Sequence, residues 1–167
     1  MSVHEYRGQS ISIPDNDSEY KGYFDAAKEH GLVVKKCLEC GHLRGEPGPG
    51  CPWCPSLRWE WETVSGNGTI YSYQIVAHTV LPGFKEWVPF PIVLVELDEQ
   101  SGWPNPDDGL RITANLLDDD LNPEKEENVA IGKRVEAVFV DLADGLTIPQ
   151  FKLSGEPPKG PVWRYPA

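Results

Sequence analysis

Four cysteines form two Cys-x-x-Cys pairs, and they are all the cysteines that the chain contains. The first pair is Cys37 and Cys40, and the second is Cys51 and Cys54. Two thiolate pairs on either side of a short loop can close a tetrahedral shell of four sulfurs around one zinc ion. The spacing therefore predicts a zinc ribbon, in which zinc is structural because a closed four-sulfur shell leaves no position for a reacting water.

Redox chemistry and a disulfide are the competing interpretations of these cysteines. A redox pair is expected at the start of a helix, but the segment EPGPGCPWCPS is too rich in Pro and Gly to begin one. A disulfide is typical of secreted proteins, and the N-terminal MSVHEYRGQSISIPDNDSEY has no apolar stretch of the signal-peptide type. We therefore expect zinc, with His42 as a solvent-facing neighbour of the site rather than a ligand.

The two pairs differ in the residues that follow them. Gly41 comes directly after Cys40 and can adopt the positive φ that a tight knuckle turn needs. Pro55 comes directly after Cys54 and has no backbone N–H to offer a cysteine sulfur, although Pro52 stiffens the turn. We expect the second knuckle to be the weaker half of the site.

The segment before the cysteines predicts one helix and one strand. Asp17 or Ser18 can cap a helix whose apolar residues recur at helical spacing, and Gly31 ends it. The following LVVKK predicts a strand that leads into the first pair, and LRWEWETV, after the second pair, alternates like another strand. We expect residues 1–17 to be polar and extended.

Five further strands are predicted after Gly66, with turn residues and no long helix between them. They are 68–79, 90–98, 110–117, 133–142 and 146–153. Five short strands behind a zinc ribbon favour an OB-fold barrel, and a small β-sandwich is the alternative. The expected fold class is mainly β, with an N-terminal helix, a four-cysteine zinc ribbon and a five-stranded OB-fold barrel. The expected domains are an N-terminal extension and helix (1–32), the ribbon (33–62), the barrel (63–154) and a Pro-rich aromatic tail (155–167).

The charge of the chain bears on nucleic-acid binding, which zinc ribbons and small barrels often perform. The 167 residues include 26 acidic and 15 basic side chains, for a formal net charge of −11. Binding to phosphate backbones depends on Lys and Arg, so this composition predicts no nucleic-acid partner. The best local basic patch is Lys35, Lys36 and Arg44. No apolar run is long enough to cross a bilayer, so we expect no membrane contact and a cytoplasmic protein.

No nucleophile–base combination is evident in the sequence, because all four cysteines are assigned to metal. His78 falls within a predicted barrel strand and is the one candidate acid or base, with a partly buried structural histidine as the preferred interpretation. The run Asp118, Asp119 and Asp120 is interpreted as a solvated charge run rather than a metal site. We expect no catalytic residues.

The order of the motifs resembles a known family. A helix of the type YFDAAKEHGLVVKKC is followed by the two cysteine pairs, then by SGNGTIYSY, IVLVELD and IGKRVEAVFVD…GLTIPQF. This resembles the zinc-ribbon/OB-fold family known as domain of unknown function thirty-five, over roughly residues 18 to 153. Pro55 departs from the Gly usual at that place in the family.

The resemblance implies a non-catalytic accessory subunit in acyl-CoA metabolism. Members of the family form hetero-oligomers with thiolase-fold enzymes, either thiolases or retro-aldolases, and support or shape the acyl-CoA site of the partner. Others pair with MaoC-type enoyl-CoA hydratases, which is the alternative partner here. An autonomous OB-fold nucleic-acid-binding protein is the alternative of another class.

Aromatic residues outside the predicted strands are the candidate contacts to a partner or to acyl-CoA. Phe84, Lys85 and Trp87 lie in the loop between the first two barrel strands, and Trp163 and Tyr165 lie in the tail. The alternative for the loop residues is that they plug one end of the barrel. Because the chain is anionic, we expect the partner to hold most CoA phosphates, with Lys35, Lys36 and Lys85 as the possible exceptions.

Overall fold

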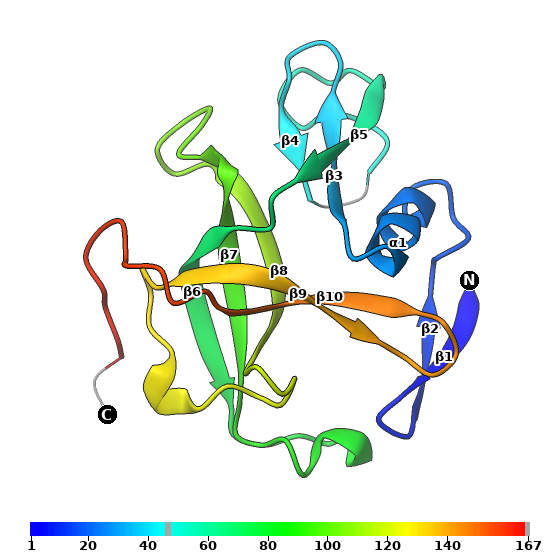
Figure 1. Cartoon of the computed structure of the whole chain (residues 1–167). Helices are drawn as coiled ribbons and strands as arrows, with labels where there is room; N and C mark the ends of the chain where they lie inside the picture. Colours follow the sequence, from blue (N-terminus) through cyan, green and yellow to red (C-terminus); the bar gives the residue numbers. More distant parts are fainter. Residues whose placement is uncertain (46–47, 166–167) are drawn as a thin grey trace.

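A computed structural model describes residues 1–45 and 48–165, and Figure 1 shows a barrel, a small ribbon of strands above it, and a helix and a hairpin near the N-terminus. The barrel contains the five strands that the sequence predicts. They are β6 (Gly68–Val76), β7 (Phe90–Ser101), β8 (Gly109–Leu117), β9 (Arg134–Asp141) and β10 (Thr147–Leu153). The expected fold class is therefore confirmed.

The barrel is closed in the order β10-β8-β7-β6-β9. Neighbouring strands of the barrel are antiparallel, except that β10 and β8 pair in parallel, at Phe151 and Lys152 of β10. A bulge between Ile70 and Ser72 interrupts the pairing of β6 with β7, which allows the strand to bend around the barrel. The alternative of a β-sandwich is wrong, because the sheet closes on itself.

The ribbon is a three-stranded antiparallel sheet in the order β4-β3-β5. Its strands are β3 (Leu32–Cys37), β4 (Leu43–Arg44) and β5 (Trp59–Val64). Trp59 and Trp61 lie on the same face of β5, as the alternation predicts, with ring centroids 5.2 Å apart. Cys37 is the last residue of β3 and Cys40 lies in the turn to β4, while Cys51 and Cys54 lie in the loop between β4 and β5.

The helix α1 (Lys21–Lys28) begins later in the chain than the sequence predicts. Its N-cap is Tyr20, with no side-chain cap, and the expected caps Asp17 and Ser18 lie before it. Asp17 instead forms a turn, in which its carboxylate accepts the N–H of Glu19 and its carbonyl accepts the N–H of Tyr20. Ala27 is buried on the inner face of the helix.

Gly22 allows a close approach of α1 to Trp61 of the ribbon. A Cβ at this position would lie 2.2 Å from Nε1 of Trp61. Gly→Ala usually stabilises a helix by about 1 kcal/mol, but here we expect Gly22→Ala to destabilise by about 1–3 kcal/mol through overpacking. Chemical denaturation measures the difference, and Gly160→Ala, which meets open space, is the matched control. A Gly22→Ala variant as stable as the parent would contradict this packing.

Residues 1–17, expected to be polar and extended, form a β-hairpin. Its strands are β1 (Ser2–Tyr6) and β2 (Gln9–Ile13), joined at Arg7 and Gly8. Both turn residues have positive φ, 54° and 71°, as type I′ hairpin turns require. His4 holds the hairpin to the barrel: its Nδ1 is 3.0 Å from the Asp144 carboxylate.

Two apolar clusters hold the parts together. The main core fills the barrel and extends into the ribbon, so that residues of β3 and β5 pack with those of the barrel strands. The ribbon residues in this core are Leu32, Val34 and Val64. A second cluster lies around Trp87, Phe90 and Leu117. Because one core spans ribbon and barrel, the stability of each depends on the other.

None of the helices in the described ranges is long and apolar enough to cross a membrane.

Candidate metal centre and partner surfaces

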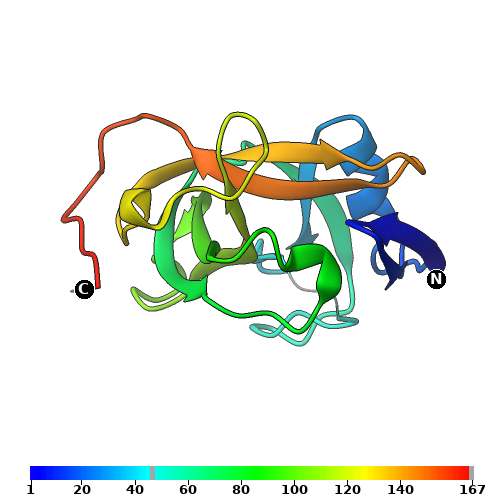
Figure 2. The ribbon, with the colours of Figure 1, turned by 90° about the horizontal axis from the view of Figure 1, so that it is seen from below.

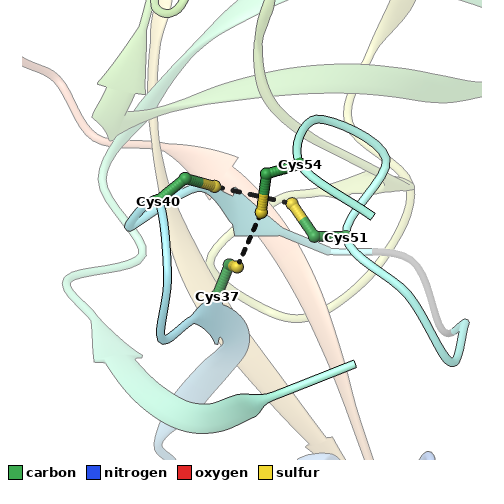
Figure 3. Close-up of side chains that lie close together, drawn as sticks. All are labelled: Cys37, Cys40, Cys51 and Cys54. Carbon is green, nitrogen blue, oxygen red and sulfur yellow. Dashed lines mark hydrogen bonds between the residues drawn. The ribbon is translucent and has the colours of Figure 1, made fainter. Parts of the chain in front are cut away.

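The four cysteines converge on one point, as Figure 3 shows. Their sulfurs all lie within 4.8 Å of one another. The Sγ atoms of Cys37 and Cys54 are 3.5 Å apart, and those of Cys40 and Cys51 are 3.6 Å apart. These distances exceed the roughly 2.05 Å of a disulfide bond. The cluster therefore has the arrangement of a metal centre rather than of two disulfides.

The geometry of the cluster fits a tetrahedral zinc ion. A Zn–S distance of about 2.3 Å places neighbouring sulfurs about 3.8 Å apart, close to the separations in this structure. Cys37 and Cys51 are buried, and Cys40 and Cys54 are partly so. Four soft donors at these distances leave no room for a fifth ligand, so the arrangement suits a structural ion.

Backbone N–H groups stabilise negative charge on the sulfurs at both knuckles. At the first knuckle the N–H groups of Cys40 and Glu39 approach the Cys37 sulfur. Gly41 has the positive φ that the sequence predicts, 76°. At the second knuckle Trp53 N–H lies 3.4 Å from the Cys51 sulfur, and Ser56 N–H approaches that of Cys54. Ser56 thus supplies the contact that Pro55 cannot, and the second knuckle is not short of hydrogen bonds.

The thiols compete for negative charge in the absence of a cation. The N–H of Cys40 outweighs burial and lowers the pKa of Cys37 to about 6. At Cys40 the N–H of His42 acts in the same direction, but burial and hydrogen bonds with the other cysteines raise the pKa to about 12. A divalent cation would remove this competition, because it stabilises all four thiolates together.

His42 lies beside the cluster and is not one of the four ligands. Its ring stacks on Trp53, with centroids 6.3 Å apart, and faces Trp103 at 6.0 Å. Nδ1 is buried and has no hydrogen-bond partner among the described residues. His42 is thus partly buried between the two tryptophans rather than solvent-facing, and this burial lowers its pKa.

The basic patch considered in the sequence is not present at the surface. The side chain of Lys35 is 2% exposed, pairs with Glu19 and lies 4.1 Å from the centroid of the Trp59 ring. Arg44 is buried, and its guanidinium donates to the carbonyl of Gly50. Lys36 is paired with a carboxylate of β5. Lys35 is therefore a structural cation and is not available to a phosphate.

His78 lies beyond the end of β6 and is exposed, so its placement within a strand, partly buried, is corrected. Asp118 uses its carboxylate to accept the N–H groups of Asp120 and Asn122, which forms a tight turn. Asp119 is exposed and pairs with Lys152. The run Asp118–Asp120 therefore forms a surface turn.

The candidate contact residues in the loop after β6 differ in their burial. Trp87 is 8% exposed and packs with Phe90 and Leu117, while Phe84 is partly buried against them. The guanidinium of Arg7, from the N-terminal hairpin, lies 4.0 Å from the centroid of the Trp87 ring. This arrangement favours the barrel-plug alternative over a partner contact for Trp87. Lys85 is exposed on the same loop.

The two tail aromatics are exposed but held in place. Trp163 and Tyr165 are 50% and 72% exposed, and their rings meet edge to face at 5.8 Å. Trp163 exchanges two backbone hydrogen bonds with Ile131, at 2.8 and 3.0 Å. The N–H of Tyr165 donates to the hydroxyl of Tyr73 on β6, at 2.9 Å. The tail therefore presents a fixed aromatic surface, a feature that its Pro-rich sequence alone did not predict.

Comparison with known proteins places the barrel and the ribbon in one family. The C-terminal OB-fold domain of ChsH2 matches residues 61–140. A DUF35 domain-containing scaffold protein of Methanocaldococcus jannaschii is 34% identical over 110 residues, which are 65% of this chain and 67% of that protein. A probable enoyl-CoA hydratase alpha subunit of Thermomonospora curvata is 35% identical over 130 residues, or 78% of this chain. The chain spans 36% of the length of that subunit.

A solved structure resembles almost the whole fold. A chain of the Ltp2-ChsH2(DUF35) aldolase superposes with a TM-score of 0.67 and 30% sequence identity. The match covers 86% of this chain and 98% of that one.

Proposed function

Because the chain belongs to the DUF35 family, we propose that it is a non-catalytic, zinc-binding accessory subunit of a thiolase-fold enzyme that acts on an acyl-CoA. Its role is to support assembly of the complex and to shape the acyl-CoA site of the partner. The observation that carries the proposal is the match to nearly all of one chain of the Ltp2-ChsH2(DUF35) aldolase.

The architecture suits a scaffold whose surfaces are held rigidly. Zinc at the four cysteines would fix the ribbon, and the ribbon shares its core with the barrel. The described histidines do not form a catalytic group: His4 and His30 pair with carboxylates, and His42 lies between tryptophans. The chemistry is therefore assigned to the partner.

Co-expression with candidate enzymes tests the proposal. We expect the tagged chain to co-purify in a fixed ratio with a thiolase-fold enzyme of the same organism, and the enzyme to lose most of its activity or solubility when expressed alone. A thiolase-fold enzyme that is fully active without this chain, and does not bind it, would contradict the assignment.

A MaoC-type enoyl-CoA hydratase is the second candidate partner. It is favoured by the likeness to the hydratase alpha subunit of Thermomonospora curvata, of which this chain would represent one part. The same co-expression with hydratase subunits as bait distinguishes the two. A nucleic-acid partner is disfavoured, because Lys35 and Arg44 are buried and the net charge is −11.

The charges also predict how CoA is shared between the subunits. With Lys35 buried and Lys36 paired with Glu62, Lys85 is the exposed cation left from the candidates. We therefore expect the isolated chain to bind acetyl-CoA at least about 100-fold more weakly than the complex does, because the partner holds most phosphates. Isothermal titration of acetyl-CoA into both measures this ratio. Tight binding to the isolated chain, lost in Lys85→Gln, would place the phosphates here instead.

A further inference from the structure

One side of β6 is paired only at its beginning. On the side away from β7, Gly68 and Thr69 pair with β9, and Ile70 exchanges backbone hydrogen bonds of 2.8 and 2.9 Å with Gly132 and Lys133. From there to Val76, β6 has no strand partner on this side within residues 1–45 and 48–165. Alternate residues of a strand direct their N–H and C=O groups to each side. An unused row of donors and acceptors therefore runs along this edge.

A groove of about 490 Å³ lies against the unpaired edge. It is lined by Ser72–Ile75 of β6, by Glu126 and Ile131, and by Trp163–Tyr165 of the tail. Figures 1 and 2 both place the tail on the same side of the barrel as η2 (Glu126–Asn128), away from α1. Because hydrogen bonds to Ile131 and Tyr73 hold the tail, the groove exists before any partner binds.

The groove itself carries one carboxylate, Glu126, and one guanidinium, Arg164, and the segment that contains Glu126 is acidic. The segment 118–128 carries six carboxylates and a single lysine, Lys125. Glu126 lines the groove itself, and Arg164 is held by the carbonyl of Glu127. An occupant with basic side chains would be complementary in charge to segment 118–128, which borders the groove at Glu126, and to the net charge of −11. An apolar side chain would be complementary to Trp163 and Tyr165.

We propose that Tyr71–Val76 of β6 receives an extended, basic segment of the partner enzyme as an added strand. The backbone of that segment pairs with the open edge, and its alternating side chains meet the tail aromatics on one side and Glu126 on the other. This inference rests on the proposed function for the identity of the partner, but it concerns an edge that can be tested in the chain alone.

Hydrogen exchange of the purified complex tests strand addition directly. We expect backbone amides within Tyr71–Val76 to exchange at least tenfold more slowly in the complex than in the free chain. An intact, active complex in which these amides exchange as in the free chain would overturn the inference and leave the proposed function standing.

Two charge-reversal variants test the role of the Glu126 carboxylate in binding a basic segment. Glu126→Lys should weaken association of the chain with the partner enzyme at least fivefold at low salt. This loss of affinity should become smaller as the salt concentration is raised. Glu29→Lys is the matched control, since Glu29 is an exposed carboxylate at the end of α1. Thermal melts confirm that both variants fold. Equal effects of the two variants would overturn the charge argument.

A synthetic peptide makes the test independent of the partner. Lys-Val-Lys-Val-Lys-Val at millimolar concentration should shift the amide resonances of Tyr71–Val76 in the free chain. The same peptide with N-methyl groups on alternate residues keeps every side chain and should not. If neither peptide shifts these resonances, or if both do so equally, the edge does not accept a strand.

Discussion

Loss of the metal should unfold the ribbon and destabilise the whole chain, and this is the largest effect that the structure predicts. Zinc binding to four thiolates contributes about 10–16 kcal/mol in small zinc domains near neutral pH. Neither Cys51→Ser nor chelation should leave a stable ribbon, because the loops around the cluster contain mainly Pro, Gly and polar residues. Far-ultraviolet circular dichroism and the fluorescence of Trp53, Trp59 and Trp61 follow the change.

The effect should reach the barrel because the two parts share a core. Leu32 and Val34 of β3 pack in the same cluster as the barrel residues Ile70 and Val95. Unfolding of β3 would expose this apolar surface to water, so we expect one cooperative transition at a lower temperature rather than a separate melt of the ribbon.

The ligand assignment has a matched control in the same loop. His42→Ala should keep one zinc per chain by elemental analysis, whereas Cys51→Ser should lose it or bind it far more weakly. A Cys51→Ser variant with one zinc and the parent's melting temperature would contradict a four-cysteine site. Loss of zinc in His42→Ala, with the fold retained, would assign a ligand role to the imidazole.

The cysteine cluster and the barrel could be predicted from the sequence because their signals are local. The spacing of Cys37 and Cys40 predicts a knuckle, and the continuous apolar run within 90–98 predicts a buried strand whatever its neighbours are. The strand β6, which contains Thr69, could be predicted from its own residues. Its unpaired edge could not, because that edge depends on where β9 stops pairing with β6.

Burial that depends on distant segments was not predictable in this way. Lys35 is buried because Glu19, sixteen residues earlier, provides its charge partner and Trp59 its ring. Trp87 is buried because the hairpin at the N-terminus brings Tyr6 and Arg7 to it. The sequence around each residue contains no trace of these contacts.

An ion pair between two barrel strands, in which the guanidinium is buried and the carboxylate is partly accessible to solvent, supports the second large prediction. Arg134 on β9 is 2% exposed, and its Nη1 and Nη2 donate to the Asp98 carboxylate of β7 at 2.8 and 2.5 Å. Nη1 also donates to the hydroxyl of Thr69 on the strand between them, and Nε to Glu156. Asp98→Ala leaves the buried guanidinium with the exposed Glu156 as its only carboxylate partner among those described, which should cost about 3 kcal/mol.

Arg134→Met should cost less, about 1–2 kcal/mol, because it removes the buried charge and keeps the apolar stem. The double variant should resemble Arg134→Met, since Asp98 then has no guanidinium to neutralise. Arg58→Met, which breaks an ion pair with Glu39 at the surface, is the control and should cost below about 1 kcal/mol. Urea denaturation at neutral pH measures all four.

The ion pair also predicts the response to acid. Burial opposes ionisation of Asp98, but hydrogen bonds from Arg134 and Lys159 outweigh it and lower the pKa of the carboxyl. A lowered pKa contributes stability that is complete above the unfolded pKa of about 4 and disappears as the pH falls through the folded value. The gap in unfolding free energy between the parent and Asp98→Ala should therefore narrow below about pH 4.

The tail links this pair to the proposed docking edge. Glu156 pairs with Arg134, and Lys159 pairs with Asp98. The segment after β10 is therefore held to the barrel a few residues before Trp163. Asp98→Ala should speed hydrogen exchange within 155–165 and weaken complex formation under conditions where the barrel is still folded. An Asp98→Ala variant no less stable than Arg58→Met would contradict the ion-pair argument. Unchanged exchange in the tail would show that the bonds of Trp163 and Tyr165 hold it without the pair.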